Sequence, residues 1–118
     1  MKFTLPLPPS INQTYGVSRS GEHPMYKRKE VKDWEFTAGW EIKRQYPGLI
    51  ELKGPVKIGI TWYYRTDRDI DAGFKVLLDL LQRQRVYLND RQVRKIMYVD
   101  IFEDKKNPRV EVEVYEMD

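Results

Sequence analysis

The sequence predicts one small domain of the α+β class, in which helices pack on a mixed sheet. Alternating apolar residues predict strands, apolar residues at helical spacing predict helices, and the segments follow the order strand, helix, strand, helix, strand, strand. Of the 118 residues, 41% are hydrophobic and 13% are aromatic, as in folded proteins. No linker divides the chain, so we expect a single domain over residues 1–118 with a modest core.

Composition excludes several classes of function. The chain has no cysteine, which rules out disulfides, thiol chemistry and cysteine-based zinc sites. It also lacks a membrane-spanning apolar run of about 18 residues and a signal-peptide pattern. We therefore expect a soluble cytoplasmic protein with no membrane partner and no small-molecule cofactor.

The formal net charge of +3 understates how basic most of the chain is. Four acidic residues gather near the C-terminus, at Glu111, Glu113, Glu116 and Asp118. Basic surface elsewhere is the usual footprint of phosphate-backbone binding, although any single Lys or Arg more often lies on a solvated face.

The N-terminal third predicts a strand, a loop and a helix. Residues 3–7 form the first strand, which Pro6 places at a sheet edge or ends. Residues 10–25 are rich in Ser, Gly, Asn and Pro and read as a loop, which holds the only histidine, His23. We assign His23 no catalytic role, because no orienting partner stands beside it.

A helix is expected from about Lys27 to Tyr46, because its apolar residues recur at helical spacing. The basic segment at its start, Lys27 to Lys32, is a better candidate for nucleic-acid binding than the tryptophans Trp34 and Trp40. Trp34 and Trp40 can be core or dimer contacts or base-stacking residues, and both interpretations stay open.

The second half alternates more clearly. Residues 56–64 predict a strand that ends near Arg65, and a helical pattern begins at Phe74. Residues 93–102 and 109–115 predict two further strands, joined by a hairpin loop over residues 103–108.

Three carboxylates, Asp69, Asp71 and Asp90, stand at the ends of these segments, and Lys75 follows Asp71 by four residues. Converging carboxylates need positive charge between them, and an all-oxygen set suits Mg²⁺ or Mn²⁺ rather than zinc. If the strand that follows Asp90 packs beside the strand of residues 56–64, Asp90 returns to the same sheet end as Asp69 and Asp71. The alternative is that Asp71 only caps the helix and the other carboxylates are surface charges.

The run DIDAGFKVLLDLLQRQRVYLND resembles the signature of the RusA-type Holliday-junction resolvases. In that signature an Asp-x-Asp is followed by a Lys, an Asp and a further Asp beyond the helix. Near the N-terminus, LPLPPSINQTY resembles the Pro-Pro-Ser-x-Asn opening of the same family. The matching positions of the signature are Asp69, Asp71, Lys75, Asp79 and Asp90. Ala72 departs from the Asn that family members often carry, and this departure leaves reduced activity or a different metal preference open.

The resemblance implies a RusA-like fold and a Mg²⁺-dependent endodeoxyribonuclease, with Mn²⁺ as a substitute. Such an enzyme resolves four-way DNA junctions by paired symmetric nicks in recombination and repair. A homodimer would act on branched DNA in a bacterial or phage-infected cell. Asp69, Asp71, Lys75 and Asp90 would be catalytic, and the three Asp residues would bind the metal. Asp79 would support Lys75.

We expect DNA contacts at Asn12, Lys27, Arg28, Arg65 and Arg68. For Arg65 and Arg68, the equal alternative is that they only offset the repulsion among nearby carboxylates. Two other functions stay open: a branched-DNA or flap nuclease of broader specificity, and a junction-binding protein that does not cleave.

Overall fold

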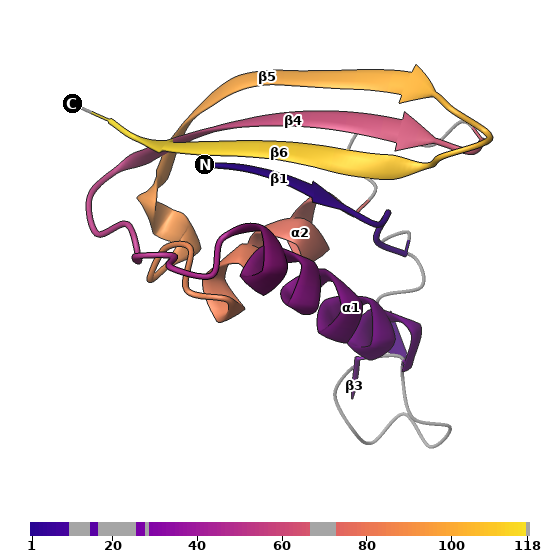
Figure 1. The fold of residues 1–118 in the computed structure, drawn as a ribbon, viewed down its shortest axis with the longest axis horizontal. Coiled ribbons are helices and arrows are strands. Elements are labelled where there is room, and N and C mark those ends of the chain that lie inside the picture. The colour runs from indigo at the N-terminus through magenta and orange to yellow at the C-terminus, as the bar shows by residue number, and fades with distance from the viewer. Residues whose placement is uncertain (10–14, 17–25, 28, 67–72, 118) are drawn as a thin grey trace.

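The computed structural model describes residues 1–9, 15–16, 26–27, 29–66 and 73–117. They form two layers, a four-stranded sheet and two helices below one of its faces (Figure 1). In chain order the elements are β1 (Lys2–Leu5), β2 (Tyr15–Gly16), β3 (Tyr26–Lys27), α1 (Lys29–Gln45), β4 (Val56–Tyr64), α2 (Phe74–Arg83), the 3-10 helix η2 (Asp90–Gln92), β5 (Val93–Glu103) and β6 (Arg109–Glu116). The predicted α+β class and mixed sheet are confirmed.

The strand order of the main sheet is β1-β6-β4-β5. Strand β4 runs parallel to β5 and antiparallel to β6, and β1 runs antiparallel to β6 at the other edge. The parallel pair needs a crossover connection, which α2 supplies. The first strand therefore lies at an edge, as its prolines predicted, and ends before Pro6.

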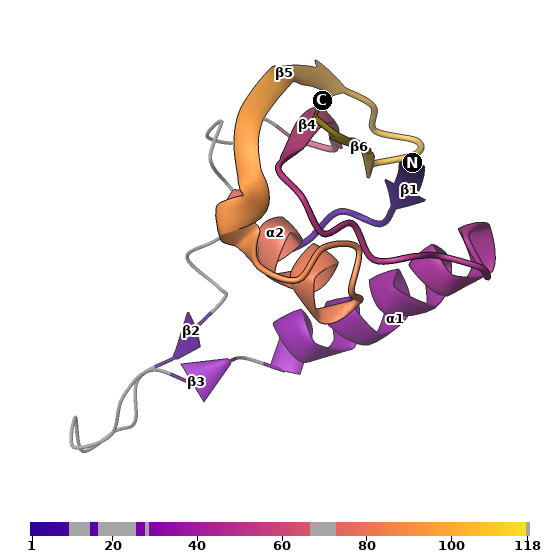
Figure 2. The ribbon, with the colours of Figure 1, turned by 90° about the vertical axis from the view of Figure 1, so that its left-hand side faces the viewer.

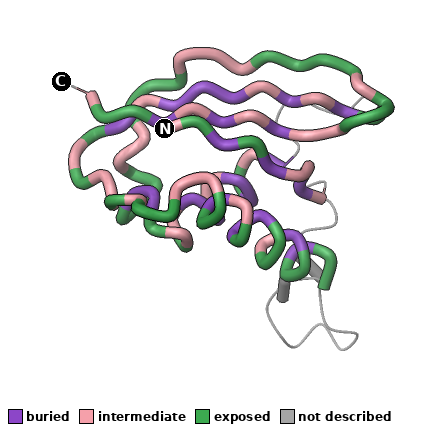
Figure 3. Tube along the Cα trace, in the orientation of Figure 1, coloured by how far each residue is buried: buried purple, intermediate pink, exposed green. Residues whose placement is uncertain are grey.

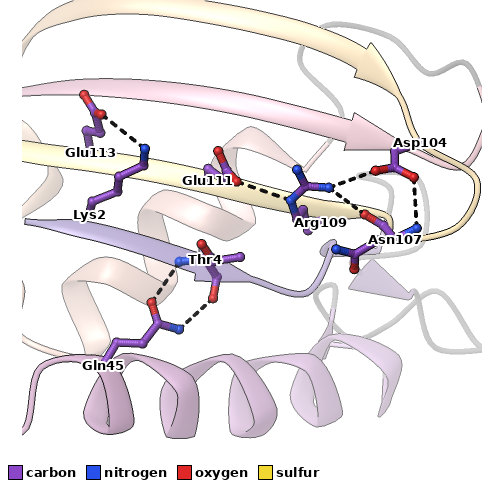
Figure 4. A network of polar contacts seen from close by, with 8 residues as sticks. All are labelled: Lys2, Thr4, Gln45, Asp104, Asn107, Arg109, Glu111 and Glu113. Carbon is purple, nitrogen blue, oxygen red and sulfur yellow. Dashed lines mark hydrogen bonds and ion pairs between the residues drawn. The ribbon is translucent and has the colours of Figure 1, made fainter.

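Residues 103–108 do not form the predicted hairpin loop. Strand β4 lies between β5 and β6, so the two strands that this loop joins are not hydrogen-bonded neighbours. The loop passes the end of β4, where the Asp104 amide donates to the Tyr64 carbonyl at 2.8 Å. Arg109 holds the loop with hydrogen bonds to the Asp104 carboxylate and the Asn107 carbonyl, both at 3.0 Å (Figure 4). Its cationic group lowers the pKa of Asp104, after the larger effect of the hydrogen bond from the Asn107 amide.

A short antiparallel pair of strands, β2 and β3, lies apart from the main sheet (Figure 2) and was not predicted. Lys27 belongs to β3, and α1 begins at Lys29. The expectation that Lys27 opens the helix is therefore wrong.

The core fills the space between the sheet and the helices. Alternate residues of β4 and β6 face the helices and are buried, as their period-two pattern predicted (Figure 3). Helix α1 contributes Val31, Trp34, Ala38 and Ile42, all buried. The Trp34 indole donates to the Pro6 carbonyl at 2.8 Å, so Trp34 is a core residue, whereas Trp40 is 62% exposed. Within the described residues, no helix is long and apolar enough to cross a membrane.

Helix α2 begins directly after Gly73, which is its N-cap residue and makes no side-chain capping hydrogen bond. The suggested capping role of Asp71 falls on a residue outside the described part of the chain and stays a prediction. Gly73 has a φ of 78°, and a Cβ placed there would lie 2.8 Å from Pro8 Cγ. Both facts favour glycine at the junction between residues 67–72 and the helix.

Replacing Gly73 by Ala is expected to lower the free energy of unfolding by about 1–2 kcal/mol, the usual cost of a left-handed backbone for a residue with a Cβ. Urea titration followed by circular dichroism measures this change. The matched control is Gly48→Ala, because nothing lies within 4 Å of a Cβ at Gly48. Equal stability of the two variants would contradict the expectation.

Candidate active site

Asp90 is exposed and opens η2, the turn that leads from α2 into β5. Because Val56 of β4 pairs with Val93 of the parallel β5, Asp90 lies near the start of β4. Residues 67–72 instead follow the other end of β4, beyond Tyr64. The expectation that Asp90 returns to that same sheet end is wrong, since parallel neighbours begin at the same end.

Asp90 instead lies beside helix α2, which follows residues 67–72 in the chain. Phe74, in the first turn of α2, borders the same hollow as Asp90, together with Leu78 and residues 93–96 of β5. This hollow has a volume of about 470 Å³. Four of its seven lining residues are apolar, and its charged groups are Asp90, Arg94 and Lys95.

The backbone of Asp90 is held by a side chain of α2. The Asp90 amide donates to Gln82 Oε1 at 3.0 Å. Next to it, the Asn89 side chain accepts from the Arg91 amide at 2.9 Å, so η2 starts with a capping box. The Asp90 carboxylate itself makes no hydrogen bond or ion pair to the described residues, and it is therefore available to a ligand.

Gln92 fixes the same turn from its other end. Its Oε1 accepts from the amides of Leu88 and Asn89 at 2.8 and 2.9 Å. Its Nε2 donates to the carbonyls of Leu52 and Gly54, both at 2.9 Å. One side chain thus ties the Asp90 turn to the segment that precedes β4. Gln92 was not among the predicted site residues, although the run Asn-Asp-Arg-Gln matches a capping box.

Lys75 lies on the exposed surface of α2, in its first turn and directly after Phe74. Asp79 follows one helical turn later and is half-buried. This spacing agrees with the predicted support of Lys75 by Asp79, which stays a prediction.

A family model described as Endodeoxyribonuclease RusA matches residues 6–115. The chain belongs to the RusA endodeoxyribonuclease family. Among relatives, the protein named Crossover junction endodeoxyribonuclease RusA from Aquifex aeolicus (strain VF5) is 31% identical over 103 residues, which are 86% of this chain and 79% of the relative. The predicted family and enzyme class, an endonuclease acting on DNA, are confirmed.

Five residues predicted for this RusA site lie outside the described part of the chain: Asn12, Arg28, Arg68, Asp69 and Asp71. Asp90 is the one predicted metal ligand that the structure describes. Among the described residues, no three Asp, Glu or His side chains come together as a metal site. The roles assigned to these residues stay predictions.

Arg65 is exposed and follows the end of β4. Tyr64 pairs with Glu103 at that end, whereas Asp90 precedes the opposite end of β5. The nine residues of β4 span about 26 Å at the usual rise of a strand. The structure therefore does not bring Arg65 together with Asp90.

Tyr87 is buried beneath the Asp90 turn of the RusA domain. Burial, and then the negative charges of Asp90 and Asp79, raise the pKa of its phenol far above the ordinary value. Its hydroxyl donates to the Leu78 carbonyl at 3.0 Å. Tyr87 is therefore a neutral structural residue that joins the turn to α2, and not an acid or base in the reaction.

Proposed function

We propose that this chain, as a single domain, is a metal-dependent nuclease that resolves four-way DNA junctions by paired symmetric nicks. Membership of the RusA family and the name of the Aquifex relative support this substrate. The observation that carries the proposal is the exposed Asp90 carboxylate at a hollow shared with the first turn of α2.

The residues present fit a hard divalent cation. Asp90 offers carboxylate oxygens without a competing cation bound to them among the described side chains, and its backbone is fixed by Gln82. In the sequence, Asp71 precedes the N-cap Gly73 by two residues, and Asp69 precedes Asp71 by two more. Asp69, Asp71 and Asp90 would hold Mg²⁺, with Mn²⁺ as a substitute, because both prefer oxygen ligands.

Such a cation lowers the pKa of a bound water and stabilises charge on the attacking and leaving oxygens. The protein's own contribution is position and charge. Gln82 and Gln92 fix the turn that carries Asp90, which limits the directions in which its carboxylate can reach. Lys75 brings a positive charge to the first turn of α2, where it would offset charge on the phosphoryl group.

Paired nicks in two strands require two sites. A two-fold homodimer would supply one site for each strand. We place this reaction in the recombination and repair of DNA in the cytoplasm of a bacterial or phage-infected cell.

The test is cleavage of a labelled immobile four-way junction in Mg²⁺ or in EDTA, with linear duplex as the control substrate. We expect symmetric paired nicks that require both the metal and Asp69, so the Asp69→Asn variant should not cut. Equal cleavage of flaps and forks would favour a broader branched-DNA nuclease. Tight junction binding without a metal-dependent cut would overturn the nuclease proposal.

A further inference from the structure

Four exposed cations surround the turn that carries Asp90, and none of their side chains makes an ion pair within the described part of the chain. We call them the basic strip: Lys53, Arg91, Arg94 and Lys95. Most of the other arginines that the structure describes are neutralised, as by the contacts of Arg44 with Glu41 at 2.7 Å and Arg83 with Glu35 at 2.8 Å. The basic strip therefore leaves positive charge available to a partner.

The four side chains border two hollows that meet at Arg94. One is the hollow of about 470 Å³ that Asp90 borders, where Arg94 and Lys95 supply the positive charge. The other, of about 250 Å³, is lined by Lys53, Arg91 and Arg94 together with the backbone before β4. A partner that follows these hollows passes directly beside Asp90.

The charge of this region suits a polyanion. Four cations against the single carboxylate of Asp90 give the strip a formal excess of three positive charges, equal to that of the whole chain. The Gln92 hydrogen bonds to Leu52 and Gly54 tie the Lys53 segment to the Arg91 turn. A preformed cationic surface needs little rearrangement to bind repeated phosphates.

We infer that the basic strip binds the phosphate backbone of the DNA arm that leads into the candidate active site. This inference rests on the proposed function only in taking Asp90 as the mark of that site. It assigns DNA contacts to four residues for which the sequence motifs gave no signal. Their roles would be positional, because phosphate contacts fix the register of a duplex without reading its sequence.

The test measures binding of a fluorescent four-way junction by anisotropy over a series of salt concentrations in EDTA, where no cleavage occurs. The test variant is Arg94→Ala with Lys95→Ala. The matched control is Lys43→Ala with Lys106→Ala, which removes two exposed cations from other elements. Each lost phosphate contact lowers the salt slope by about one, so we expect the test variant to lower it by about two.

Adding Lys53→Ala and Arg91→Ala should lower the slope by about two more. Circular dichroism should show both variants folded, since all four side chains are exposed. A wild-type slope in the test variant, or an equal loss in the control, would overturn the inference. Because binding is measured without the metal, the strip can bind the junction even if the protein does not cleave it. The protein can also cleave the junction even if the strip makes no contact, so the two proposals fail separately.

Discussion

Replacing Asp90 by Asn is expected to lower metal-dependent DNA cleavage by at least about 100-fold, because even changes in the groups behind a metal ligand cost 10- to 100-fold. The fold should survive, since the Asp90 carboxylate is exposed and the hydrogen bond to Gln82 comes from the backbone amide. The free energy of unfolding of the variant should therefore stay within about 0.5 kcal/mol of the wild-type value.

Cleavage alone would not identify Asp90 as a ligand, so the variant also needs a direct measurement of metal. Titration with Mn²⁺, followed by its electron paramagnetic resonance signal, should show weaker binding in Asp90→Asn. In EDTA the same variant should bind a junction at least as tightly as the wild type, because it lacks the negative charge of Asp90 beside the basic strip.

The matched control is Asp100→Asn, which removes an exposed carboxylate from β5 away from the hollow. It should cleave DNA and bind Mn²⁺ like the wild type. If Asp90→Asn kept wild-type cleavage and Mn²⁺ binding, Asp90 would not be a ligand. If both variants lost activity equally, a general effect of charge would explain the result.

Local pattern was enough to predict most elements of this fold. The alternation of β4 and β6 and the helical spacing of α1 and α2 are properties of consecutive residues, and they gave the correct type of element. Strand pairing is different, because it depends on contacts between distant segments. The sequence therefore suggested that β5 and β6 pair with each other, whereas both pair with β4.

The same limit applies to the site. Asp90 was nominated from its spacing, but its position beside α2 follows from the parallel pairing of β4 and β5. The bond from the Asp90 amide to Gln82 spans 8 residues, and the bonds that tie Gln92 to the segment before β4 span 38 and 40, so local pattern did not reveal them. The basic strip was missed for a related reason: Lys53 and Arg94 are brought to one hollow only by the fold.

Gln92 should matter both for stability and for metal use. Its side chain makes four hydrogen bonds, two to amides of its own turn and two to carbonyls before β4. At about 0.5–1.5 kcal/mol for each bond, Gln92→Ala is expected to lose about 2–6 kcal/mol of unfolding free energy. Urea titration provides this measurement.

The loss of Gln92 also frees the turn that carries Asp90. At a temperature where Gln92→Ala is still folded, we expect a higher Mg²⁺ concentration for half-maximal cleavage, and weaker Mn²⁺ binding, by about 10- to 100-fold. Gln82→Ala should cost less stability, since one hydrogen bond to the Asp90 amide is lost. It should still weaken Mn²⁺ binding and raise the Mg²⁺ concentration for half-maximal cleavage, because that bond positions Asp90 directly.

A second glutamine that joins two elements by hydrogen bonds, Gln45, is a control that separates lost stability from misplacement of Asp90. Gln45 on α1 bonds to both backbone groups of Thr4, at 2.9 and 2.8 Å (Figure 4). Thr4 belongs to β1, at the sheet edge opposite β5, which the Asp90 turn precedes. Gln45→Ala should therefore unfold more easily and yet keep the wild-type Mg²⁺ requirement. If Gln45→Ala shifted that requirement as far as Gln92→Ala does, the shift would reflect lost stability, and Gln92 would not act through Asp90.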